Sequence, residues 1–142
     1  MIAALCVAGV AGAKAASPAP TDIVGRWTSM KGDLVLDVSP CGTSWCGVRV
    51  DGGACGMIAL RLDAGEHMAG AAQFRGRLQL VAKTASYAVR ADLIPGEAED
   101  TFKLSIVGNT GKDFAYFART FPYSELFVRS DKVTCLANQK TS

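Results

Sequence analysis

The sequence predicts an all-β protein whose strands form an antiparallel barrel of about eight strands. Apolar residues recur at every second position through much of the chain, which is the side-chain period of a strand with one buried face. Breaks at glycine, proline and aspartate interrupt this alternation about every ten to twelve residues, as they do in barrels and sandwiches. No segment keeps a convincing helical period over three turns. Closure into a barrel is favoured because it removes the exposed edges of an open sheet.

The alternation assigns the individual strands in order. The predicted strands cover residues 23–29, 34–40, 47–50, 58–62, 78–80, 87–93, 102–106, 113–120 and 125–129. In the fourth of them, Ile58, Leu60 and Leu62 are expected to share one face. The segment 63–73, "DAGEHMAGAAQ", is the least strand-like, and we expect a long loop or a short helical turn there.

The N-terminal segment has the pattern of a secretory signal peptide. Residues 1–15, "MIAALCVAGVAGAKA", are small and apolar and end in an A-x-A motif. This run is too short to span a bilayer as a helix, and a disordered or core N-terminus is the alternative. The chain then divides into an extended linker over 16–22, one barrel domain over 23–136 and a flexible tail over 137–142. The predicted location is the periplasm or the exterior of the cell.

Composition places few limits on partners. The 142 residues are 49% hydrophobic and carry a formal net charge of +2, from 15 basic and 13 acidic residues. Charges of both signs alternate along the chain, without the basic run that is typical of nucleic-acid or anionic membrane binding. The sequence therefore predicts no nucleic-acid partner and no transmembrane span.

The cysteines favour two disulfides. Cys6 lies in the predicted signal peptide, which leaves Cys41, Cys46, Cys55 and Cys135. An even number in an exported chain favours disulfides, with three possible connectivities. We prefer Cys41–Cys46, because a short loop between antiparallel strands brings its ends within disulfide reach. Cys55–Cys135 is then the remaining pair.

Other chemistry at these cysteines is less favoured. A thioredoxin-type centre needs C-x-x-C, whereas "CGTSWC" has four residues between its cysteines. A structural zinc site needs four ligands, such as three thiolates and His67, the single histidine. The chain lacks a second close-spaced cysteine pair, so we predict no metal and no cofactor.

Catalytic motifs are equally scarce. His67 lies in a segment rich in glycine and alanine, where a plain surface residue is the usual interpretation. The acidic residues Glu97, Glu99 and Asp100 follow Pro95 and Gly96 and are typical of a solvated turn. No serine or cysteine nucleophile has an evident base in a known motif. We therefore expect a protein without catalytic residues.

Aromatic residues gather in the last third of the chain, and two interpretations stay open. They either form the core and rim of the barrel, or partly line a cavity for a hydrophobic ligand. An eight-stranded barrel is just wide enough to fill itself with side chains or to hold one small ligand. The candidate ligand-binding residues are Tyr87, Phe114, Tyr116 and Phe117.

Gly25-Arg26-Trp27 is a G-x-W motif at the start of the first predicted strand. In an exported β-rich domain it resembles the opening motif of the lipocalin-like (calycin) barrels. The resemblance implies that Trp27 closes one end of the barrel, that Gly25 permits a close backbone approach, and that a late arginine covers the indole by a cation–π contact. Arg129 is the preferred candidate for this arginine, and Arg119 is the second.

A longer stretch, "GRWTSMKGDLVLDVSPCGTSWCGVRV", resembles the start of a family of bacterial secreted proteins, the domain-of-unknown-function family 2147. The resemblance is strongest over residues 24–50. The matching positions are Gly25, Trp27, Cys41, Gly42, Cys46 and Gly47. The fold that this resemblance implies is again a lipocalin-like barrel, and the family has no established activity.

Two functions follow as hypotheses. The first is a barrel that binds a small hydrophobic or amphipathic ligand in the cell envelope, which predicts an apolar internal pocket. The second is a protein-interaction module, such as a periplasmic protease inhibitor or an envelope-assembly factor. The projecting segment of such a module would be the N-terminal arm before residue 23 or the segment 63–73.

Overall fold

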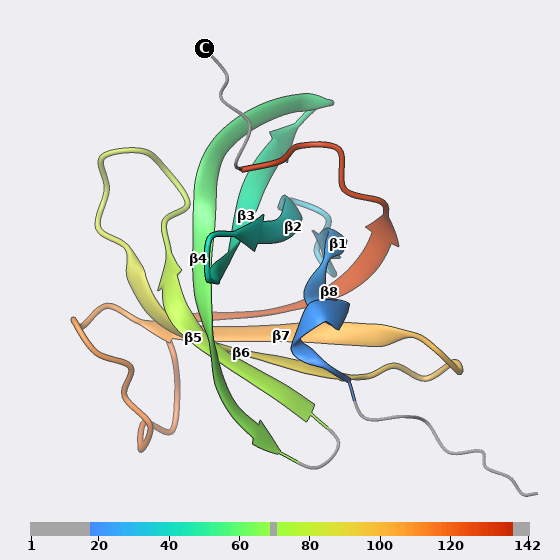
Figure 1. Ribbon diagram of the computed structural model, residues 1–142. Helices are drawn as coiled ribbons and strands as arrows, with labels where there is room; N and C mark the ends of the chain where they lie inside the picture. The colour runs from blue at the N-terminus through green and yellow to red at the C-terminus, as the bar shows by residue number, and fades with distance from the viewer. Residues whose placement is uncertain (1–17, 69–70, 138–142) are drawn as a thin grey trace, which may run out of the picture.

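Eight antiparallel strands close into one barrel, which confirms the predicted fold class (Figure 1). The computed structural model describes residues 18–68 and 71–137, and the side chains of residues 66–68 are outside this description. The strands are β1 (Gly25–Ser29), β2 (Val35–Cys41), β3 (Ser44–Asp51), β4 (Ala54–Met68), β5 (Ala71–Leu78), β6 (Tyr87–Pro95), β7 (Phe102–Asn109) and β8 (Tyr123–Asp131). Each strand pairs with its neighbour in sequence, and β8 pairs with β1 to complete the closure.

Some predicted segments lie outside the described residues. These are the signal peptide over 1–15, with Cys6 in it, and most of the tail, residues 138–142. In the part of the chain that is described, no helix has the length and apolar character needed to cross a bilayer.

The interior of the barrel is filled by one hydrophobic cluster. Most of its members are inward-facing residues of the strands, in the alternation that the sequence predicts, and Ile23 and Leu34 join them from outside the strands. The largest of them are fully buried: Trp27, Phe74, Phe127, Leu36, Leu60, Leu62, Leu78, Leu93, Leu104 and Ile106. Burial of such side chains contributes about 1.5–3 kcal/mol each, so this cluster is the main source of stability.

The prediction of a loop or helical turn over 63–73 is wrong. β4 runs through to Met68 and β5 begins at Ala71, with His67 paired to Ala72 across the hairpin. Alanine and glycine are poor strand formers. Here the ladder to the neighbouring strands fixes the backbone, and tertiary context overrides the local preference.

A shift of register in β4 corrects a second prediction, the shared face of Ile58, Leu60 and Leu62. Val48 on β3 pairs with Ile58, whereas Gly47 pairs with Leu60. One step on β3 therefore spans two steps on β4, and Ala59 is the extra residue. Such a β-bulge changes the side of the sheet to which the residues before and after it point. Ile58 is consequently exposed, whereas Leu60 and Leu62 are fully buried in the core.

Both predicted disulfides are present, in the preferred pairing. Cys41 and Cys46 join the ends of the β2–β3 hairpin, with their Cα atoms 5.8 Å apart. Because Cys41 pairs with Ser44 and Cys46 with Ser39, the bond crosses the ladder diagonally. Cys55 and Cys135, 80 positions apart in the sequence, have Cα atoms 5.5 Å apart.

Replacement of both Cys41 and Cys46 by alanine is expected to lower the free energy of unfolding by about 2 kcal/mol. The reason is the small ring that this disulfide closes, which removes little entropy from the unfolded chain. Urea denaturation of the wild type and of the double variant, both with the Cys55–Cys135 disulfide oxidised, measures the loss. The comparison is valid if the two proteins have the same m-value. A variant that no longer unfolds in a single transition would contradict this local role.

One end of the barrel is closed by a short 3-10 helix, η2 (Pro20–Ile23). The sequence predicts an extended linker over 16–22, so the turn at its end is a correction. Ile23 is fully buried, and its carbonyl accepts a hydrogen bond of 2.8 Å from Nε1 of Trp27. This bond satisfies the indole N–H inside the core and fixes the helix against β1.

Arg129 completes this closed end, as the G-x-W resemblance predicts. Its guanidinium lies 4.8 Å from the ring centre of Trp27 and donates a hydrogen bond to the carbonyl of Asp22. Gly25 has a φ of 155°, and a Cβ there would lie 2.9 Å from Nε of Arg129. A larger residue would therefore displace the arginine from the indole, which explains the glycine of the motif.

The chain end after β8 forms what we call the C-terminal strap, residues 132–137. It lies against the outer face of β2 and β3, where Val48 and Val50 point away from the barrel core. Together with Cys135 these two valines form a second, smaller hydrophobic cluster. The strap thus gives the barrel a covered outer face on this side, and the Cys55–Cys135 disulfide ties it to β4.

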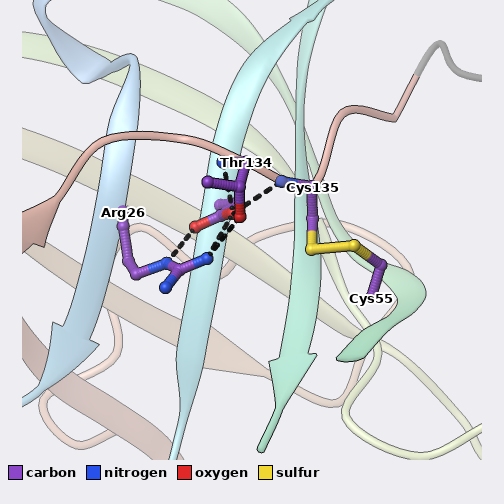
Figure 2. The surroundings of a disulfide bond; sticks show 5 residues. Arg26, Cys55, Thr134 and Cys135 are labelled. Atoms are coloured by element: carbon purple, nitrogen blue, oxygen red, sulfur yellow. Dashed lines mark hydrogen bonds and ion pairs between the residues drawn. A yellow bond between two sulfur atoms is a disulfide. The ribbon is translucent and has the colours of Figure 1, made fainter. Parts of the chain in front are cut away.

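Asp37 connects the strap to the barrel by hydrogen bonds with Arg26, Thr134 and Cys135, three of the residues labelled around it in Figure 2. Its carboxylate is completely buried and accepts hydrogen bonds from Arg26 at 2.7 Å and 3.0 Å. The backbone N–H groups of Thr134 and Cys135 donate to the same carboxylate at 2.9 Å and 2.8 Å. Burial opposes ionisation, but the hydrogen bonds from Arg26, Cys135 and Thr134 outweigh it and hold the pKa of Asp37 below its ordinary value.

Candidate functional site

The loop between β7 and β8, residues 110–122, carries an aromatic cluster on the outside of the barrel. Phe114 stacks on Phe121, with ring centres 5.3 Å apart and an angle of 12° between the planes. Tyr116 meets Phe114 edge to face at 4.9 Å. Phe117 is 99% exposed, the highest exposure among the large apolar side chains described. We call residues 110–122 the aromatic loop.

The prediction of a strand over 113–120 is therefore wrong, and Asn109 supplies the physical reason. Its side-chain amide donates to the carbonyl of Asp113 at 2.9 Å and accepts from the N–H of Ala115 at 2.8 Å. These bonds replace backbone pairing with a neighbouring strand and turn the chain back on itself. The alternation of aromatic residues, which predicts a strand, serves the stacking within the loop instead.

Arginines of β5 and β6 hold the aromatic loop against the barrel. The guanidinium of Arg75 lies 5.2 Å from the ring centre of Tyr116, and that of Arg90 lies 5.9 Å from Phe114. Arg77 donates to the carbonyl of Lys112 at 2.6 Å. A surface groove of about 260 Å³ runs between the loop and these strands.

The arginines also lie opposite one another across the sheet. Arg75 pairs with Arg90 between β5 and β6, and Arg61 pairs with Arg77 between β4 and β5. Like charges directly opposite each other are destabilising. Arg90 has an ion pair with Asp92 at 3.0 Å, but no carboxylate of the described residues forms an ion pair with Arg75 or Arg77. Among the described side chains, this face therefore carries four arginines beside two carboxylates, Asp63 opposite Arg75 and Asp92 paired with Arg90.

The structure separates the predicted ligand-binding residues into two groups. Tyr87 lies at the rim of the barrel, where its ring centre is 5.5 Å from that of Tyr123. Burial raises the pKa of the Tyr123 hydroxyl, which keeps it neutral. Phe114, Tyr116 and Phe117 lie instead on the aromatic loop, outside the barrel. The four residues do not line one internal cavity.

Other candidate residues lie apart from this surface. Arg119, the second candidate for the Trp27 contact, is on the aromatic loop, whereas Arg129 makes that contact. Glu97, Glu99 and Asp100 are exposed in the turn between β6 and β7, as expected of a solvated turn. Glu97 forms an ion pair with Lys103 at 3.5 Å. Among the side chains that the structure describes, which exclude those of residues 66–68, no group of three histidine, cysteine or acidic residues could hold a metal ion.

The sequence names Phe114, Tyr116 and Phe117 as candidates, but sequence reasoning missed that they lie on a loop outside the barrel, against arginines of β5 and β6. The signal that could have found it is the asparagine-glycine-rich "GNTGKD" before the aromatic run, which is turn chemistry rather than strand chemistry. Comparison of the chain with protein-family models, curated proteins and solved structures finds no match.

Proposed function

We propose that this protein is a non-enzymatic binding module that acts through the outer surface of its barrel, at the aromatic loop. The observation that carries the proposal is the placement of the large apolar side chains. Trp27, Phe74 and Phe127 are fully buried in the barrel interior, whereas Phe117 is exposed on a loop. An eight-stranded barrel is filled by side chains of this size, which supports an external rather than an internal binding site.

The disulfides support a cellular compartment for this function. Disulfides persist in oxidising compartments, so the two that we observe support export to the periplasm or the exterior. The resemblance of residues 24–50 to the domain-of-unknown-function family 2147 belongs to the same proposal. The interaction module, which is the second hypothesis from the sequence, is thereby favoured over the carrier of a small apolar ligand.

Small apolar ligands are expected to leave the wild-type protein unaffected and to stabilise the Phe74→Ala variant. Removal of this buried ring opens a dry apolar cavity, and a ligand that binds only the folded state raises its unfolding temperature. Thermal unfolding with and without benzene or a medium-chain fatty acid measures the effect. Leu104→Ala supplies a second cavity if Phe74→Ala does not fold.

A variant outside the core is the control for this test. Phe117→Ser alters the aromatic loop and leaves the core as it is, so it should behave as the wild type does. Saturable stabilisation of both the wild type and Phe117→Ser by one of these ligands would place a ligand inside the barrel. That result would overturn the proposal in favour of a carrier.

A further inference from the structure

Three loops at one end of the barrel expose apolar side chains. Residues 30–34, 79–86 and 110–122 follow β1, β5 and β7, and loops after alternate strands of an antiparallel meander emerge at the same end. Figure 1 shows the latter two projecting on one side of the barrel. Their exposed apolar side chains are Met30, Val81 and Phe117, at 60%, 58% and 99% exposure.

These loops are close together at the mouth of the barrel. Residues of all three line one hollow of about 230 Å³, among them Lys31, Leu80 and Pro122. Arg49 on β3 donates to the carbonyl of Leu80 at 2.6 Å and so anchors the second loop there. We call these three loops the apolar-tipped end.

The same loops carry basic side chains beside their apolar ones. The exposed cations are Lys31, Lys83, Lys112 and Arg119, and Arg75 and Arg77 adjoin them on β5. The acidic residues in these loops are Asp33, which accepts a hydrogen bond of 2.9 Å from the Ser29 hydroxyl, and Asp113. Glu125, near the start of β8, also forms an ion pair of 3.6 Å with Lys31. The apolar-tipped end is therefore positive overall. The sequence hides this because the cations come from separate segments.

The opposite end of the barrel carries an acidic turn, with Lys103 and Arg129 beside it. The turn over 96–101, between β6 and β7, exposes Glu97, Glu99 and Asp100. The protein is thus polarised along the barrel, with cations and apolar tips at one end and an acidic turn at the other. An anionic surface would therefore attract the first end more strongly than the second.

We propose that the apolar-tipped end docks on the surface of a lipid bilayer that contains anionic phospholipid. This inference rests on the proposed function and names the partner of the same surface. Apolar and aromatic side chains that enter the headgroup boundary, flanked by lysine and arginine near lipid phosphates, are the pattern of interfacial membrane binding. A second copy of the chain is disfavoured, because it would bring like charge to the interface.

Nucleic acid fits the surface less well. Base stacking needs aromatic faces that are free on a platform, whereas Phe114 is already stacked on Phe121 and Arg75 covers Tyr116. Phe117 is a single projecting ring, which suits insertion between lipid headgroups. The disulfides also favour a compartment outside the cytosol.

Co-sedimentation with vesicles tests the proposal. The oxidised protein is expected to bind vesicles of phosphatidylcholine with phosphatidylglycerol and not vesicles of phosphatidylcholine alone, with binding that weakens as salt rises. Phe117→Ser should reduce the partition coefficient about tenfold. Lys112→Gln combined with Arg119→Gln should reduce it about fivefold for each charge removed.

Matched variants at the other end are the controls. Val24→Ser removes an apolar side chain that is 38% exposed next to the closed end, and Lys103→Gln removes a cation that pairs with Glu97. Both should leave vesicle binding unchanged. All proteins share one N-terminus, determined by mass, so that residues before the barrel contribute equally to each.

A second measurement does not depend on loss of binding. The emission of Phe117→Trp should shift to the blue on anionic vesicles, whereas that of Val24→Trp should not. Absence of binding to anionic vesicles, equal binding by Phe117→Ser, or binding to single-stranded DNA in preference to vesicles would each overturn the membrane partner. None of these results would overturn the proposed function, a binding module that acts through its outer surface. That proposal fails only if an apolar ligand stabilises the wild type and Phe117→Ser in the thermal-unfolding experiment.

Discussion

Replacement of Trp27 by alanine is expected to lower the free energy of unfolding by about 4 kcal/mol. The indole is fully buried at the closed end of the barrel, so its removal leaves a large cavity in the main core. It also removes the hydrogen bond to the Ile23 carbonyl and the surface on which Arg129 lies. Small domains are stable by only about 5–15 kcal/mol, so this variant should retain little stability.

Urea denaturation measures the change, and two variants separate its causes. Trp27→Phe keeps an aromatic ring but leaves the Ile23 carbonyl without its donor, so we expect a smaller loss of about 1–3 kcal/mol. Phe117→Ala removes an aromatic ring of similar size that is 99% exposed and should change stability by less than about 0.5 kcal/mol. A loss below about 1 kcal/mol for Trp27→Ala would contradict tight packing at the closed end.

Replacement of Asp37 by alanine should lower the free energy of unfolding by about 3 kcal/mol. The change leaves Arg26 without its carboxylate and the buried N–H of Cys135 without an acceptor. Breaking a buried, hydrogen-bonded ion pair from one side costs about 3–5 kcal/mol, and the partial exposure of Arg26 places the expected loss at the lower end. Urea denaturation at neutral pH is the measurement.

The pH dependence of stability identifies Asp37 as the cause. Its pKa in the folded protein lies below the ordinary value of 3.8, so the folded state favours the ionised form. The resulting stabilisation is complete above pH 3.8 and is lost as the pH falls through the lower, folded-state pKa. The difference in stability between wild type and Asp37→Asn should therefore shrink in that acidic range.

An exposed pair provides the control for Asp37. Asp51 forms an ion pair of 2.9 Å with Arg49 at the surface, where its side chain is 59% exposed. Exposed pairs contribute about 0–1 kcal/mol, so Asp51→Ala should have little effect at any pH. Equal losses for Asp37→Ala and Asp51→Ala would show that the strap does not depend on the buried carboxylate.

The sequence was sufficient for the barrel because period-two alternation is a local property. Leu36 and Val38, or Leu104 and Ile106, show their shared face within five residues, and both pairs are fully buried. The disulfide pairing followed from a hairpin and from elimination. The Arg129–Trp27 contact, in contrast, rested on a resemblance to known barrels rather than on the local pattern.

Two of the wrong predictions, for residues 63–73 and 113–120, have one physical origin. In both segments, contacts with residues elsewhere in the chain outweigh the local preference for a loop or a strand. The strand over 63–68 forms because β5 pairs with it, although most of its residues are poor strand formers. The aromatic loop is not a strand because the Asn109 side chain occupies the backbone groups of Asp113 and Ala115. The same limit hid the candidate site, since its cations and apolar tips come from three separate segments, residues 30–34, 79–86 and 110–122.

The strand order of the barrel has a consequence for how the chain folds. Seven of the eight ladders join strands that are consecutive in the sequence, and the eighth joins β8 to β1. The hairpins can form one after another through contacts of short range, whereas the closing ladder requires both ends of the domain. The strap makes the same demand, because Asp37 and Cys55 near the start must meet Thr134 and Cys135 at the end. The barrel therefore completes its fold only after synthesis has reached the strap. Until then the nascent chain is an open meander that lacks both the β8–β1 ladder and the Cys55–Cys135 disulfide.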